Sequence, residues 1–171
     1  MRVAPLGAYF ADDLDRTVVE ATRSAEVTHA HPEGIAGAIA VSIAAAIAAR
    51  DGARGVDLLR AVCDHVPRGY TRDGIEEAIG VDASETSVRA AATLGNGSGV
   101  TAADTVPFCL WIVAHRAASF EEALWETVAG LGDRDTTCAI VGGLVAARDG
   151  AASIPAAWRR AREPLPAWMR E

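Results

Sequence analysis

Aromatic residues, basic residues and long strongly apolar runs are all scarce in this 171-residue sequence. Aromatics make up 5% of the chain although half of it is hydrophobic, so aliphatic residues dominate, and Ala and Leu among them favour helices. Lys and Arg number 16 against 23 Asp and Glu, which gives a formal net charge of −7. Such an acidic chain lacks the basic surface that nucleic acid or an anionic membrane attracts, so we expect neither as a partner.

The chain shows no pattern typical of a membrane span or an export signal. The longest uncharged run, residues 34–49, is shorter than the roughly 20 strongly apolar residues that a membrane-spanning helix needs. Its small residues favour a tightly packed central helix instead. Met1 is followed at once by a charged residue and then by no apolar stretch long enough for a signal peptide.

The three cysteines, Cys63, Cys109 and Cys138, lie far apart and show no Cys-x-x-Cys spacing. Such isolated cysteines within apolar runs are typical of buried free thiols in a reducing compartment. We therefore expect a cytoplasmic protein.

Caps and turns divide the sequence into successive helices, and no convincing strand pattern appears. We predict a single all-α domain over residues 1–171. The expected helices cover residues 12–28, 33–50, 56–66, 73–79, 84–94, 104–118, a helix capped by Ser119, 133–149 and 153–162.

The segment Gly130 to Thr137 is the best candidate for chemistry, because two carboxylates and a hydroxyl precede a long apolar helix. Asp133, Asp135 and Thr136 offer oxygen atoms, which hard cations such as Mg²⁺ prefer. The alternative is structural, since Asp is an ordinary N-cap and acidic residues are common in a first turn. Spacing alone does not decide between the two interpretations.

Two further segments have weaker patterns. Thr28 to His31 carries two histidines before a proline, which suits a metal or phosphate contact but is also a common loop feature. Gly95 to Gly99 is a glycine-rich loop whose amides could cradle a phosphate, yet no Gly-Lys-Ser/Thr follows it.

Taken together, these segments resemble the ADP-ribosylglycohydrolase family. Met1 to Gly7 is similar to the family's Met-Arg-x-x-Pro-(Leu/Ile)-Gly segment, and Ser24 to Glu33 to its Thr-His motif before the central helix. Gly132 to Thr137, followed by residues 139–144, matches its Gly-Asp-x-Asp-Thr metal motif. Within that motif Leu131 stands where glycine is commoner, and Arg134 where threonine is commoner.

The resemblance implies a compact orthogonal bundle of α-helices with two Mg²⁺ or Mn²⁺ ions in a cleft that binds ADP-ribose. It leaves the catalytic residue unknown. By the same resemblance, the metal ligands are Asp133, Asp135 and Thr136, and the substrate-binding residues are His29, Gly97, Ser98 and Gly99.

One departure from the family pattern concerns its N-terminal half. The Gly-Asp-(Ala/Ser)-Leu-Gly and Thr-Asp-Asp segments, which supply the other metal ligands in the family, have no counterpart in this sequence. We therefore expect a C-terminal half that lacks the family's N-terminal helices. The implied function is a metal-dependent hydrolase that removes ADP-ribose from a protein or small-molecule acceptor.

Two alternatives remain open at this point. The chain could be a catalytically incomplete remnant or split-protein subunit, which would need an N-terminal partner or self-association. It could also be a non-catalytic helical interaction module.

Overall fold

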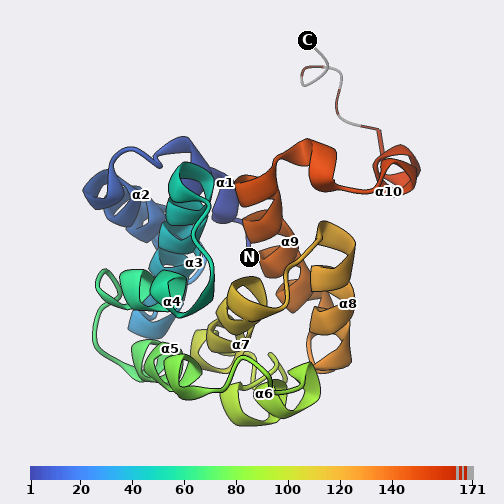
Figure 1. The fold of residues 1–171 in the computed structure, drawn as a ribbon. Coiled ribbons are helices and arrows are strands. Elements are labelled where there is room, and N and C mark those ends of the chain that lie inside the picture. Colours follow the sequence, from blue (N-terminus) through green and yellow to red (C-terminus); the bar gives the residue numbers. More distant parts are fainter. Residues whose placement is uncertain (165, 167, 169–171) are drawn as a thin grey trace.

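The computed structural model describes residues 1–164, 166 and 168, and these residues form ten α-helices and one short 3₁₀ helix without any strand (Figure 1). The prediction of an all-α helical bundle is therefore confirmed. The helices are α1 (Ala4–Tyr9), α2 (Leu14–Glu26), α3 (Pro32–Asp51), α4 (Gly55–Cys63), α5 (Tyr70–Gly80), α6 (Ser87–Leu94), α7 (Ala102–His115), α8 (Phe120–Ala129), α9 (Arg134–Asp149) and α10 (Ala156–Ala161), with η1 at Ala151–Ser153.

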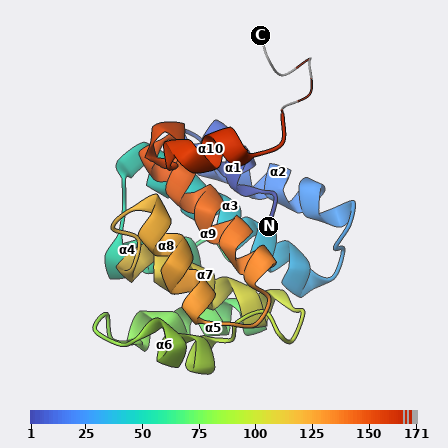
Figure 2. The same cartoon turned by 90° about the vertical axis from the view of Figure 1, so that its right-hand side faces the viewer.

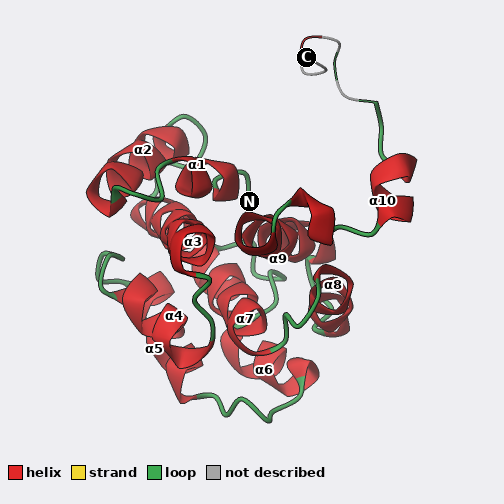
Figure 3. Cartoon of the chain, turned by 45° about the horizontal axis from the view of Figure 1, so that its top comes forward, coloured by secondary structure: helices red, strands yellow, loops and turns green. Residues whose placement is uncertain are grey.

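Helix α3 is the centre of the bundle. Every residue from Ile39 to Ala48 is buried, and α1, α2, α4, α5, α7 and α9 all contact it (Figure 3). The helix begins after His31, whose Nδ1 accepts a hydrogen bond from the Glu33 amide at 3.2 Å, and it ends at Gly52 in the left-handed conformation. The uncharged run thus forms the predicted buried helix.

Small residues on α3 allow its neighbours to approach closely. A Cβ added at Gly37 would lie 2.6 Å from the Cβ of Ala102 at the start of α7. A Cβ added at Gly7 of α1 would collide with the backbone carbonyl of Ser42. The Ser42 hydroxyl also donates to the Val3 carbonyl at 3.2 Å, which fastens the N-terminal segment to α3.

Helix α3 is also long and apolar enough to cross a membrane, the one such helix among the residues that the structure describes. About two-thirds of its most apolar window, 67%, is buried within the folded chain. A buried core helix produces this combination.

Helix α1 was not predicted. It is six residues long, includes a proline and a glycine, and has no side-chain cap. A helix of six residues is too short to be stable alone, so packing on α3 is what stabilises it. Figure 2 shows that α1 and α2 lie on the same side of α3. Helix α9 crosses nearby and contacts both α3 and α1.

The close approach of α1 to α3 generates a stability prediction. Gly7→Ala should lower the free energy of unfolding by about 1–3 kcal/mol, because the added methyl group forces two backbones apart. Urea denaturation measures the change.

Gly80→Ala is the matched control, since a Cβ there meets nothing within 4 Å at the end of α5. It should leave stability unchanged or raise it by up to about 1 kcal/mol. Equal destabilisation by the two variants would contradict the tight crossing of α1 and α3.

Candidate functional site

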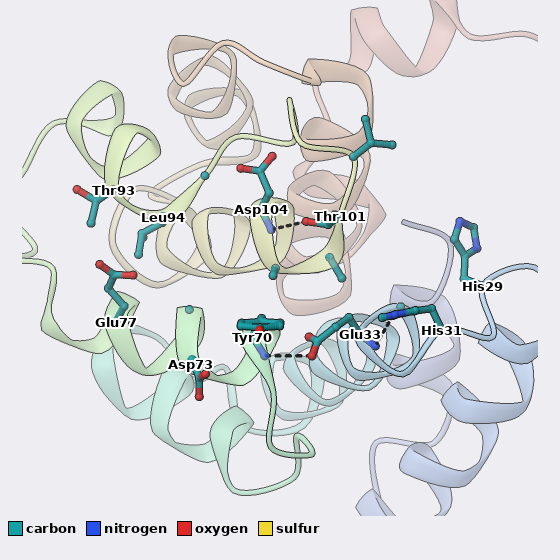
Figure 4. A pocket seen from close by; sticks show the side chains of 16 residues that line it. His29, His31, Glu33, Tyr70, Asp73, Glu77, Thr93, Leu94, Thr101 and Asp104 are labelled. Atoms are coloured by element: carbon teal, nitrogen blue, oxygen red, sulfur yellow. Dashed lines mark hydrogen bonds between the residues drawn. The ribbon is translucent and has the colours of Figure 1, made fainter.

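Two neighbouring cavities that share lining residues open beside helix N-termini. Their volumes are about 850 Å³ and about 450 Å³, and the larger one is drawn in Figure 4. Both are lined by His29, Gly34, Val100, Thr101 and Ala102. First-turn residues of α3 and α7 line both cavities, those of α5 line the larger one and those of α9 the smaller one, so the partially positive ends of four helices border the two cavities.

The smaller cavity brings the three motif segments together. Asp133 and Thr136 line it from the start of α9, and Arg2, Thr28 and His29 line it from the other two segments. The Thr28 hydroxyl joins those two segments, because it lies 2.8 Å from Nδ1 of His29 and accepts a hydrogen bond from Arg2 at 3.5 Å. Residues more than 100 positions apart in the sequence therefore share one cavity wall.

Asp133 is the N-cap of α9. Its Oδ1 accepts a hydrogen bond from the Thr136 amide at 3.3 Å. The pKa of the Asp133 carboxyl lies below its ordinary value, because of its interactions with the neighbouring Asp135 side chain and with the hydroxyl and amide of Thr136. Asp133, Asp135 and Thr136 thus lie together, but Asp135 is exposed and lines neither cavity.

These three side chains offer only oxygen donors, which suit Mg²⁺ or Mn²⁺. Within the part of the chain that the structure describes, no three His, Cys, Asp or Glu side chains form a group that could hold a metal ion. Asp133 and Asp135 offer two carboxylates and Thr136 a hydroxyl, which is fewer donors than the six that an octahedral ion takes. The remaining positions would need water, substrate or donors from another segment.

The predicted substrate-binding residues Gly97, Ser98 and Gly99 line neither cavity, whereas Gly95 and Val100 at the two ends of their loop do. Gly97 is buried. His29 lies in the lining of both cavities.

The amides of this glycine-rich loop are already engaged within the protein. The Gly97 amide donates to the Asp104 carbonyl at 2.8 Å, and the Gly99 amide donates to the Asp104 carboxylate at 2.6 Å. A Cβ added at Gly97 would lie 2.7 Å from the Cβ of Asp133. The loop therefore fastens the start of α7 to the start of α9.

The glycines before Asp133 accommodate other parts of the chain. A Cβ added at Gly130 would collide with the Phe108 ring, and one added at Gly132 would collide with Asn96. Leu131 between them has a φ of 59°, a left-handed conformation that costs a residue with a Cβ about 1–2 kcal/mol. This backbone conformation explains why glycine suits position 131 better.

Glu33 at the start of α3 also caps α5. Its carboxylate accepts hydrogen bonds from the Tyr70 amide at 3.0 Å and from the Thr71 amide and hydroxyl, each at 2.7 Å. Figure 4 shows the contact with Tyr70 beside the His31 cap of α3. Burial alone would raise the pKa of Glu33, but these hydrogen bonds outweigh it and the pKa lies below its ordinary value.

Sequence reasoning missed three residues that shape the cleft: Glu33, Asn96 and Thr101. Thr101 caps α7 by accepting from the Asp104 amide at 3.2 Å, and the Thr-x-x-Asp spacing is a signal that could have revealed it. Glu33 and Asn96 act on distant segments, so no local pattern reveals them.

A family model described as ADP-ribosylglycohydrolase matches residues 1–171. No curated protein and no solved structure matches the chain.

The Glu33 cap generates a pH-dependent prediction. Glu33→Gln should lower the free energy of unfolding at pH 7 by about 1–2 kcal/mol, because charge-assisted hydrogen bonds to α5 are lost. The folded-state pKa of Glu33 is lowered, so its stabilisation is complete above the ordinary value of 4.5 and is lost as the pH falls below that value. The difference between wild type and variant should therefore shrink in urea denaturation at acidic pH.

Glu76→Gln serves as the control, because Glu76 makes only an exposed ion pair with Arg72 at 2.9 Å. Its effect should be small at both pH values. If Glu33→Gln lowers the free energy of unfolding by the same amount at pH 7 and at acidic pH, the Glu33 carboxylate does not stabilise α5 through its charge.

Proposed function

This chain belongs to the ADP-ribosylglycohydrolase family, and on that premise we propose that it is a hydrolase that removes ADP-ribose from a protein or small-molecule acceptor with the help of Mg²⁺ or Mn²⁺. The smaller cavity is the proposed location of the chemistry, and the adjoining larger cavity extends the binding cleft. Their volumes fall in the range of small-molecule sites.

The convergence of the three motif segments carries this proposal. The Met-Arg, Thr-His and Gly-Asp-x-Asp-Thr segments are separated in sequence, yet Arg2, His29 and Asp133 line the same cavity. A role for Asp133 as a helix cap alone would not require the other two segments beside it.

The cleft offers different groups to the two ends of ADP-ribose. The N-termini of α3 and α7 favour an anionic diphosphate through their partial positive charge and amide groups. Asp133, Asp135 and Thr136 would hold the metal ions. When bound, these ions supply Lewis-acid stabilisation and a more acidic water molecule.

The donor count supports a second proposal about the same site. Two carboxylates and one hydroxyl cannot complete two octahedral ions without many waters. We therefore propose that further ligands come from an N-terminal segment, either in a longer chain or in a separate partner. The residues in this sequence alone would then bind metal weakly and hydrolyse slowly.

Calorimetric titration with Mn²⁺ in the presence of ADP-ribose tests the proposal. The wild-type chain should bind Mn²⁺ weakly, and Asp135→Ala should weaken binding further because one of the two carboxylates is lost. Addition of an N-terminal partner segment that carries carboxylates should strengthen binding and, in a separate assay with an ADP-ribosylated protein or small molecule as substrate, produce ADP-ribose release.

Asp57→Ala is the matched control, since Asp57 is an exposed first-turn carboxylate of α4 that lines neither cavity. It should leave Mn²⁺ affinity unchanged. If Asp135→Ala behaves like Asp57→Ala in affinity and in hydrolysis, the metal-binding interpretation of the motif is wrong.

A further inference from the structure

The single asparagine of the sequence lies where the glycine-rich loop meets the turn before α9. Asn96 Nδ2 donates to the Gly130 carbonyl at 3.0 Å, and its backbone carbonyl accepts from the Asp133 amide at 3.1 Å. Its Oδ1 accepts from the Ser98 amide at 3.2 Å. One residue therefore holds both ends of the turn that presents Asp133 and also folds its own loop.

The turn needs such a restraint because its backbone is unusual. Leu131 and Gly132 both have positive φ angles, of 59° and 62°. Asp133 itself has φ −80° and ψ 76°, outside the helical region. A turn of this kind persists only where its surroundings determine it.

The close packing between the loop of Asn96 and the turn before α9 also leaves little room for either segment to move. Gly132 leaves no space for a Cβ beside Asn96, and Gly97 lies against the Cβ of Asp133. The loop is fixed on its other side by Asp104. Movement of Asn96 would therefore be transmitted to the Asp133 carboxylate.

We infer that Asn96 is a positioning residue for the metal-binding carboxylates, one that fixes the direction of Asp133 relative to Asp135 and the smaller cavity. The inference rests on the proposed function. An amide is suited to this role because it donates to Gly130 and accepts from Ser98 at once, whereas alanine does neither. The partially buried side chain lines neither cavity, and its amide is already hydrogen bonded to Gly130 and Ser98.

Mn²⁺ affinity, measured by water-proton relaxation on the full chain, tests the inference. Asn96→Ala should weaken Mn²⁺ binding on the order of tenfold, as residues that orient metal ligands typically do. Asp135→Asn is measured in parallel to establish that the signal comes from this site.

Ser119→Ala is the matched control for loss of stability. Ser119 caps α8 by accepting from the Glu122 amide at 3.1 Å, at the opposite end of α8 from the Gly130 turn. Its removal costs a comparable local hydrogen bond, yet Mn²⁺ affinity should not change. Equal loss of affinity in Ser119→Ala and Asn96→Ala would overturn the inference, because it would reflect general destabilisation.

A measurement on wild type covers the case in which Asn96→Ala does not fold. Labelling with ¹⁵N-asparagine yields one backbone and one side-chain amide group, since the sequence contains no other asparagine. Mg²⁺ should shift these resonances in wild type and not in Asp135→Asn.

The outcomes separate the two proposals. If Mn²⁺ binding requires Asp135 but has the same affinity in Asn96→Ala, the role of Asn96 is overturned and the metal site stands. The same holds if metal binding leaves the asparagine resonances unshifted. Absence of any binding that depends on Asp135 overturns the metal site and the inference together.

Discussion

The close approach of helices to α3 is the constraint on which the rest of the structure depends. Gly7 of α1 packs against the backbone of Ser42 on α3, and Gly37 of α3 leaves room for the Cβ of Ala102 at the start of α7. Because α7 contacts α3 at its own first turn, the two N-termini lie side by side. The cleft forms at that point, with Gly34 of α3 and Thr101 of α7 in both cavity linings.

Carboxylates offset the partial positive charge of the converging helix N-termini. A helix N-terminus has partial positive charge and amides without partners inside the helix, and four such ends border the two cavities. The Glu33 carboxylate accepts a hydrogen bond from an amide at the start of α5, and the Asp133 carboxylate accepts one at the start of α9. The Asp104 carboxylate accepts one from the Gly99 amide in the loop before α7. The same arrangement supports both kinds of ligand in the proposed function, since carboxylates attract a cation and the remaining helix ends favour a diphosphate.

The sequence predicted the helices well where the signal was local. The buried span of α3 follows from an uncharged run between a proline and a left-handed glycine, and α9 from an acidic residue before a long apolar stretch. Helix α1 escaped prediction because its stability comes from contact with α3. In the glycine-rich loop, the Gly97 and Gly99 amides bond to Asp104, a partner that sequence spacing does not reveal.

Asp133 shows why capping and metal binding are compatible rather than competing interpretations. A carboxylate has two oxygens with several acceptor positions, and the hydrogen bond from the Thr136 amide occupies only part of that capacity. Asp135 lies beside it in the first turn of α9 and is exposed. In the proposed function, a divalent cation would use the remaining acceptor positions of Asp133 together with the Asp135 carboxylate and the Thr136 hydroxyl, because such a cation prefers oxygen ligands.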